Sequence, residues 1–253
     1  MSDEPIQFPP LFHEIFGNLP RQGPGDELST LRALAAVPHR ERIKSILDMG
    51  CGAGTPTLVL ARNTEAEIVA FDNHKPFLNK LQQNAKAENL DSRIRVELGD
   101  MCNPEFDPAS FDLIWSEGAI ASAGFEQGLT LWRDLLRDNG CVALTDLCWF
   151  TSDPPAEIHE YLTGFYPGML SVDEGVQAFD RAGYRLLDHF ALPKESWQTN
   201  YFNPLEAELV RQRSRYAGDP QALELLDMLQ TEIDMYGRYS DHYGYEFFIA
   251  QKH

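Results

Sequence analysis

Apolar runs alternate with amphipathic stretches along the chain, and this alternation predicts its elements. Short apolar runs predict strands at residues 45–49, 67–71, 93–98, 111–116 and 141–146. Between them, apolar residues recur at helical spacing, most clearly over 75–88 and 126–136. Strands that alternate with helices in this way are typical of an α/β fold, in which helices cover a parallel sheet.

The rhythm changes after the fifth strand. A helix is expected over 171–182, a strand over 184–192 and a last strand over 245–251. The long insertion over 193–243 contains helical spacing at 204–216 and at 220–236. We therefore expect a helical insertion before the last strand, as a cover on one side of the sheet.

The first 25 residues are rich in proline and glycine, and Asp26 follows them as a potential N-cap of a helix that runs to about Ala36. We interpret residues 1–38 as an arm and a helix. A chain of 253 residues is within the size of one domain, so we expect a single domain over 1–253.

Composition and charge narrow the class of protein. The 43% hydrophobic and 24% charged residues are ordinary for a globular protein, and no apolar run reaches the ~18 residues of a membrane span. The acidic N-terminus lacks the features of a signal peptide, so we expect a cytoplasmic protein. A net charge of −18 argues against nucleic acid or an anionic membrane as partner.

Cysteine and histidine give no sign of a metal site. Cys51, Cys102, Cys141 and Cys148 form no CxxC pair, and we expect them to be reduced and structural. The seven histidines are scattered without a metal-binding motif. His74 is expected at the start of a helix rather than as a catalytic base.

A glycine-rich turn follows the first predicted strand. Gly50, Gly52 and Gly54 alternate in the segment DMGCGAG, and Thr55 with Pro56 opens a helix. Glycine permits a tight turn and lets a ligand approach the backbone. The unpaired N–H groups of the helix N-terminus favour negative charge at such a turn.

An acidic residue ends the second predicted strand. Asp72 comes 18 residues after Gly54, where a carboxylate can accept hydrogen bonds from both ribose hydroxyls. Together the turn and Asp72 predict a cofactor that contains ribose. A nicotinamide fingerprint needs a third glycine at the position that Thr55 occupies, and the arrangement is instead DxGxGxG from Asp48.

In this motif the chain resembles the class I S-adenosylmethionine-dependent methyltransferases, well over residues 40–150 and in outline elsewhere. The resemblance implies a Rossmann-like fold with a seven-stranded, mostly parallel sheet, a cofactor-binding core at 40–150, and S-adenosylmethionine, with S-adenosylhomocysteine as its product. It also assigns candidate cofactor-binding residues: Gln22, Asp48, Gly50, Gly52, Gly54, Thr55, Asp72, Asn73, Phe77, Asp100, Met101, Ser116 and Glu117.

Several of these residues have a specific role by the resemblance. Asp48 supports the turn and the methionine portion, and Phe77 packs against adenine. In the Gly-Asp-hydrophobic motif after the third strand, Asp100 accepts from the adenine amino group and Met101 offers its backbone amide. Ser116 and Glu117 end the fourth strand beside the methionine arm.

The reacting centre is less defined. Glu117 is the candidate catalytic residue, as acceptor orienter, general base or partner of the cofactor's ammonium; the alternative is that it only binds the methionine amine. Gln22, in the segment RQGPG, can reach the cofactor or the acceptor, or belongs to a plain turn. The segment DPP at 153–155 is expected to be a turn and helix start.

Aromatic residues gather around the inferred mouth of the site. They either line a pocket for an apolar or cationic acceptor or are core beneath the insertion: Trp149, Phe150, Tyr161, Tyr166, Trp197, Tyr201 and Phe202. The segments around WSEGAI and CWFT also resemble uncharacterised bacterial small-molecule methyltransferases near the ubiquinone and menaquinone biosynthesis group. That resemblance implies a small-molecule acceptor without naming it.

The prediction for function is a methyltransferase that acts on a small molecule. Two alternatives stay open: an NAD(P)-dependent oxidoreductase and a protein that binds S-adenosylmethionine without catalysis. The acceptor atom, the use of a general base and the oligomeric state are not defined by the sequence.

Overall fold

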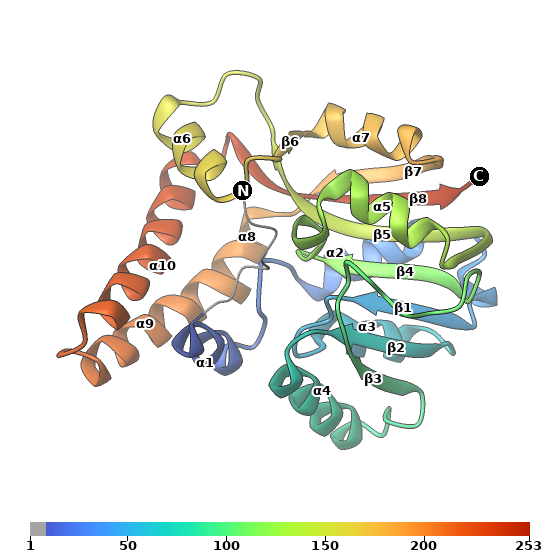
Figure 1. Ribbon diagram of the computed structural model, residues 1–253, viewed down its shortest axis with the longest axis horizontal. Coiled ribbons are helices and arrows are strands. Elements are labelled where there is room, and N and C mark those ends of the chain that lie inside the picture. The colour runs from blue at the N-terminus through green and yellow to red at the C-terminus, as the bar shows by residue number, and fades with distance from the viewer. Residues whose placement is uncertain (1–8) are drawn as a thin grey trace.

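The computed structural model describes residues 9–253, and one twisted sheet runs through it (Figure 1). The strands along the sheet follow the order β3-β2-β1-β4-β5-β8-β7, and the short β6 pairs with β5. Their bounds are β1 (Ser45–Met49), β2 (Glu67–Asp72), β3 (Ile94–Leu98), β4 (Phe111–Glu117), β5 (Leu136–Trp149), β6 (Leu170–Ser171), β7 (Tyr184–Ala191) and β8 (Tyr243–Lys252).

Strand directions confirm a mostly parallel sheet. β1 to β5 pair in parallel, whereas β8 runs antiparallel to both of its neighbours, β5 and β7. The order reverses at β1, so the chain crosses from one half of the sheet to the other between β3 and β4. In open α/β sheets, ligands bind at the carboxyl ends of the strands beside such a reversal.

Helices cover both faces of the sheet, and others form a lobe beside it. Their bounds are α1 (Pro10–Asn18), α2 (Glu27–Ala36), η1 (Arg40–Arg42), α3 (Thr55–Asn63), α4 (Lys75–Ala87), η2 (Ile120–Ala123), α5 (Phe125–Arg133), α6 (Ala156–Phe165), α7 (Val172–Arg181), α8 (Lys194–Trp197), η3 (Gln198–Phe202), α9 (Asn203–Arg215) and α10 (Pro220–Tyr239).

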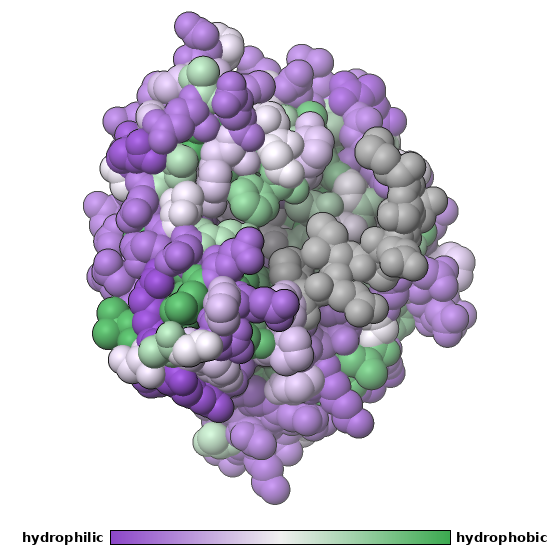
Figure 2. Space-filling view, turned by 60° about the vertical axis from the view of Figure 1, so that its left-hand side comes forward, coloured by the Kyte–Doolittle hydropathy of each residue, from purple (hydrophilic) through white to green (hydrophobic). Residues whose placement is uncertain are grey.

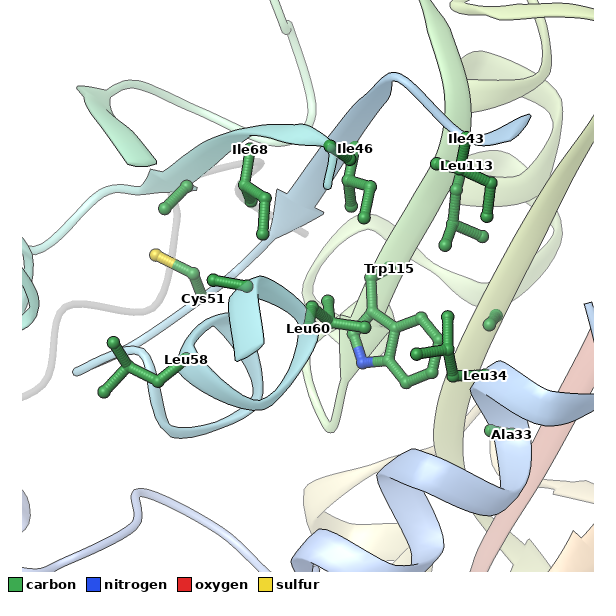
Figure 3. Close-up of a cluster of buried hydrophobic side chains, with 14 of the residues drawn as sticks. Ala33, Leu34, Ile43, Ile46, Cys51, Leu58, Leu60, Ile68, Leu113 and Trp115 are labelled. Atoms are coloured by element: carbon green, nitrogen blue, oxygen red, sulfur yellow. The ribbon is translucent and has the colours of Figure 1, made fainter. Parts of the chain in front are cut away.

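One buried cluster joins the sheet to α2, α3 and α4. Trp115 of β4 lies between Leu60 of α3 and Leu34 of α2, with Leu113 on the same strand and Ile46 on the neighbouring β1 (Figure 3). A second cluster joins the opposite face to α5 and α7. Because both faces are covered, the central strands are continuous apolar runs, which explains why their positions could be predicted.

A third cluster forms the interior of the helical lobe. It combines α1, α6 and α8 to α10 with the ends of β5 and β8. In Figure 1 this lobe lies on the left, beside the carboxyl ends of the parallel strands, and the C-terminal end of the antiparallel β8 points away from it. The expected helical insertion therefore lies next to the edge of the sheet where a ligand binds.

Some predicted boundaries were wrong. The helix expected over 126–136 ends at Arg133, and β5 begins at Leu136 rather than at 141 because Leu136 pairs with Phe111. The N-terminal arm contains α1, which was not predicted, since the prolines and glycines around it obscure its apolar face. Residues 1–8 of that arm lie outside the described residues.

Candidate functional site

The glycine turn connects β1 to α3 with left-handed backbone at all three glycines. Their φ angles are 72° at Gly50, 54° at Gly52 and 82° at Gly54. A Cβ atom on Gly50 would lie 2.4 Å from the Cβ of Ala119, and one on Gly54 would lie 2.1 Å from Leu81 Cδ1. Both the backbone conformation and the lack of space for a Cβ atom therefore require glycine here. Gly54 is the N-cap residue of α3, so the helix begins directly after the turn.

Asp72 at the end of β2 lies directly beside this turn. Its carboxylate accepts a hydrogen bond from the Gly52 amide at 2.9 Å and another from the His74 amide at 2.8 Å. Burial raises the pKa of Asp72, and these amide bonds partly oppose that effect. The carboxylate is thus fixed to the turn, and its remaining lone pairs can accept hydroxyl groups of a ligand.

Asp48 supports the turn from beneath. Its side chain is 1% exposed and accepts a hydrogen bond from Thr57 Oγ1 at 2.5 Å, which ties the end of β1 to the first turn of α3. Burial raises the pKa of Asp48 to about 7. Fixed groups of this kind hold a binding turn in one geometry.

A cavity of about 160 Å³ opens over the turn. Its lining includes eight of the residues expected from the sequence: Gln22, Asp48, Gly50, Gly52, Thr55, Asp72, Phe77 and Glu117. They come from the arm, β1, α3, β2, α4 and β4, which converge at the reversal of the strand order. Phe77 lies near Asp72 on the first turn of α4, where the resemblance places adenine.

Five expected residues do not line this cavity. Gly54 is buried under α4, and Asn73 and Asp100 are exposed. Met101 packs into the core, with its Cε 3.0 Å from the position of a Cβ on Gly50. Ser116 is buried, and its hydroxyl has no hydrogen-bond partner within residues 9–253. Their roles toward a cofactor stay predictions.

Gln22 belongs to the wall of the cavity and not to a plain turn. Its Oε1 accepts from the Ala53 amide at 2.8 Å, and its Nε2 donates to the Phe16 carbonyl at 3.0 Å. The side chain therefore connects the glycine turn to α1. An amide at this position closes the cavity from the side of the arm.

Arg21 was missed by the sequence analysis, and it forms a buried ion pair with Glu117. The two side chains are 8% and 3% exposed. Glu117 also accepts from Thr30 Oγ1 at 2.8 Å and from Trp115 Nε1 at 2.9 Å. These partners come from the arm, α2 and β4, so no local pattern in the sequence indicates them.

Tyr245 on β8 is a second residue that the sequence analysis missed. It lines the cavity, and a Cβ on Gly118 would lie 3.0 Å from its hydroxyl oxygen. Its ring lies 4.9 Å from Trp197 of the lobe, between ring centroids. Tyr245 therefore joins the cavity to the lobe interior. Its position at the start of the last predicted strand was the signal in the sequence that could have placed it near the site.

His74 is the N-cap residue of α4, in agreement with its expected position. Its ring stacks on His13 of α1 with centroids 4.0 Å apart. Burial and the neighbouring His13 lower the pKa of His74. The ring therefore belongs to the contact between α1 and α4.

Most of the aromatic residues named from the sequence are core. Six lie in or against the buried cluster of the lobe: Trp149, Tyr161, Tyr166, Trp197, Tyr201 and Phe202. Phe150 is 37% exposed and lies outside that cluster. Hydrophobic residues gather around the hollow in the face seen in Figure 2, inside a largely hydrophilic rim.

Two classes of feature are absent from the described part of the chain. No helix over residues 9–253 is long and apolar enough to cross a membrane. Within the same residues, no three His, Cys, Asp or Glu side chains gather as ligands for a metal ion.

Comparison with known families finds a match for the segment that contains the glycine turn. Residues 46–140 match the family model described as a methyltransferase domain. The sterol 24-C-methyltransferase of Kluyveromyces lactis is 28% identical over 174 residues, which are 64% of this chain and 46% of that protein. The chain spans about half the length of this relative. Residues 46–140 are therefore similar to a methyltransferase domain.

Solved structures extend the likeness to the whole fold. The S-adenosylmethionine-dependent methyltransferase of Geobacter sulfurreducens, in complex with S-adenosyl-L-homocysteine, has a TM-score of 0.83 at 19% identity over 97% of this chain and 99% of that one. The [4+2]-cyclase SpnF has a TM-score of 0.76 at 17% identity over 96% and 92%. The expected Rossmann-like methyltransferase fold is confirmed.

Proposed function

We propose that this chain is an S-adenosylmethionine-dependent methyltransferase that acts on a small molecule. The observation that carries the proposal is one cavity that combines a left-handed glycine turn, a fixed carboxylate at the end of β2 and a buried ion pair at the end of β4. Binding by itself does not make an enzyme. The methyltransferase domain over 46–140 supports the catalytic interpretation.

The residues of the cavity fit the parts of this cofactor. Gly52 has no side chain, so a nucleoside can lie against the backbone between Gln22 and Asp72. Asp72 accepts the ribose hydroxyls, and Phe77 covers the adenine ring. The Arg21–Glu117 pair offers a guanidinium and a carboxylate, which complement the two charges of an amino acid.

The cofactor, when bound, supplies a methyl group on a sulfonium that is already activated for transfer. The residues of this chain then have to orient the acceptor and exclude water. Gln22 and α1 close the cavity on one side, and Tyr245 closes it toward the lobe. Because Glu117 is engaged by Arg21, Thr30 and Trp115, we infer that it binds and orients rather than removes a proton.

The acceptor enters from the lobe in this proposal. The relative from Kluyveromyces lactis is named for a sterol, which is a small molecule with an apolar body. The aromatic interior of the lobe suits an apolar body of this kind. A relation to the ubiquinone and menaquinone biosynthesis group stays a prediction.

The two other functions make different demands on the cavity. A nicotinamide enzyme uses a third glycine where Thr55 stands, and Thr55 Oγ1 instead donates to the Pro20 carbonyl at 2.9 Å. A protein that binds S-adenosylmethionine without catalysis needs the same cavity, and the fold alone does not exclude it, since a [4+2]-cyclase is among the similar structures. Measuring which cofactor binds distinguishes the proposed methyltransferase from a nicotinamide enzyme. Measuring whether a methylated product forms distinguishes it from a protein without catalysis.

Calorimetric titration tests the cofactor. We expect S-adenosylhomocysteine to bind the wild-type chain and NAD not to bind. Asp72→Ala should weaken the binding of S-adenosylhomocysteine by more than ~1 kcal/mol, because a charge-assisted pair of hydrogen bonds is lost. Asp153→Ala, at an exposed position distant in sequence from the cavity lining, is the control. Tight NAD binding without a response to S-adenosylhomocysteine would overturn the proposal.

A further inference from the structure

Five tyrosines and two carboxylates converge in the lobe interior, next to the cofactor cavity. We call this set the tyrosine cluster; it comprises Tyr161, Tyr166, Tyr201, Tyr243, Tyr245, Asp146 and Glu232. They come from α6 and its C-terminal end, η3, β8, β5 and α10, which are distant in the sequence. The proposed cofactor chemistry uses none of them except Tyr245.

Each carboxylate in the cluster is bound to a tyrosine hydroxyl. Tyr166 donates to Asp146 Oδ2 at 2.8 Å, and Asp146 is 3% exposed. Tyr201, itself 4% exposed, donates to Glu232 Oε1 at 3.2 Å. Both carboxylates act electrostatically on Tyr245, and with burial they raise the pKa of its hydroxyl. Tyr245 thus connects the two carboxylates to the cofactor cavity.

These carboxylates lack a compensating cation among the described residues. Neither Asp146 nor Glu232 forms an ion pair with a Lys, Arg or His side chain within residues 9–253. Most of the ion pairs that do form within these residues lie on the surface. Burial raises the pKa of each to about 7, and a tyrosine hydrogen bond is the main opposing effect. Arg21, the basic group that acts on Tyr245, is already paired with Glu117.

An unpartnered donor lies in the same aromatic interior. The indole N–H of Trp197 has no hydrogen-bond acceptor among the described residues, and Trp197 is 3% exposed. Its ring stacks on Tyr236 with centroids 4.3 Å apart and meets Tyr245 at 4.9 Å. A buried donor without an acceptor is costly unless a ligand or water satisfies it.

We propose that the tyrosine cluster binds the ammonium group of the methyl acceptor, so that the substrate class is a cationic amine on an apolar body. Asp146 is buried and Glu232 is partly buried, and neither has a counter-ion among the described residues. A ligand cation would stabilise such carboxylates, and tyrosine faces attract the same charge. Trp197 and its neighbours receive the apolar body. The ammonium group is a recognition element and leaves the identity of the methylated atom open.

The inference rests on the proposed function, and the probes are chosen so that the two can fail separately. Benzyltrimethylammonium is the cationic probe, and neopentylbenzene has the same shape without the charge. Both are titrated calorimetrically into the wild-type chain saturated with S-adenosylhomocysteine at pH 8. We expect the cation to bind about tenfold more tightly than the neutral probe, as a desolvated cation–π and carboxylate site would give.

Matched variants locate the effect. Glu232→Gln and Asp146→Asn keep the shape of each side chain and remove its charge. Each variant should lower the affinity for the cationic probe about fivefold or more and leave the affinity for the neutral probe unchanged. Glu157→Gln is the control, because Glu157 also accepts from a tyrosine, Tyr239, but is exposed and paired with Arg238.

The outcomes are distinct. Equal affinity of the two probes for the wild type, or unchanged cation affinity in both cluster variants, would overturn the inference. Loss of cation affinity in Glu157→Gln as well would do the same, because the effect would then not belong to the cluster. S-adenosylhomocysteine binding in every variant is measured alongside, and its absence in the wild type refutes the proposed function instead.

Discussion

At the scale of single residues, Glu117 is held by several neighbours at the end of β4. The sequence analysis considered it as acceptor orienter, general base or partner of the cofactor's ammonium, and in the structure it is bound by Arg21, Thr30 and Trp115 at once. A carboxylate with three donors and 3% side-chain exposure is held in one orientation. Asp146 and Glu232 have fewer partners, so a bound cation would change their surroundings most.

The partly buried Glu232 makes the free energy of unfolding depend on pH in a defined direction. Burial raises its folded-state pKa from 4.5 to about 7, so the folded chain holds its proton more tightly than the unfolded chain. Its contribution to the free energy of unfolding is therefore fully present below pH 4.5 and is lost as pH rises toward about 7.

Glu232→Gln removes the charge whose burial lowers the free energy of unfolding at high pH. We expect the variant to exceed the wild type in free energy of unfolding by ~1–2 kcal/mol at pH 8 and to show no such gain at pH 5, because the glutamine keeps the Tyr201 contact without a charge. Urea denaturation of both proteins at the two pH values measures the difference. A gain that is equal at both pH values would contradict burial of the charge as its cause.

At the scale of elements, α1 and the arm after it form one side of the cavity. The cavity of about 160 Å³ is smaller than the ~300 Å³ of ordinary ligand pockets, so the arm has to move outward to admit a nucleoside. Lys80 of α4 donates to the carbonyls of Gly17 at 2.8 Å and Leu19 at 3.1 Å. These bonds hold the end of α1 just before Arg21 and Gln22.

Lys80→Ala should loosen this closure. We expect S-adenosylhomocysteine to dissociate about threefold faster or more, because two charge-assisted hydrogen bonds to the closing segment are lost. Stopped-flow displacement measures the rate, and Lys86→Ala, an exposed position on the same helix, is the control. An unchanged rate in a correctly folded Lys80→Ala variant would show that α1 does not gate the cavity.

The elements also show what the sequence can and cannot predict. β1 was predicted to the residue, because a strand buried on both faces is a continuous apolar run with a glycine turn after it. The Asp26 cap of α2 was predicted from its residue type, and the structure confirms its bond to the Ser29 amide. By contrast, α1 is nine residues between proline and glycine signals, so its apolar positions were too few to indicate a helix.

The same limit applies to the site. Asp72 and the glycines were predicted because they form one local motif whose spacing reflects the βα unit. Arg21 and Glu117 are 96 residues apart, and only the packing of the arm against β4 brings them together. The tyrosine cluster likewise assembles from five separate segments, so its carboxylates could not be distinguished from surface acids beforehand.

At the scale of the whole molecule, the chain combines a sheet that carries the cavity with a helical lobe beside the carboxyl ends of its parallel strands (Figure 1). The glycine turn, Asp72 and the Arg21–Glu117 pair lie at the carboxyl ends of the strands, and the lobe packs beside those ends. The net charge of −18 favours the approach of cationic molecules over anionic ones. This charge agrees with an amine as acceptor.

A crystal structure of the chain with S-adenosylhomocysteine tests the central claim most directly. We expect adenine beside Phe77, both ribose hydroxyls within hydrogen-bond distance of Asp72, and the amino-acid end between Arg21 and Glu117, with the sulfur directed toward Tyr245. Electron density for the nucleoside outside the glycine turn, or a turn that stays empty at saturating S-adenosylhomocysteine, would contradict it.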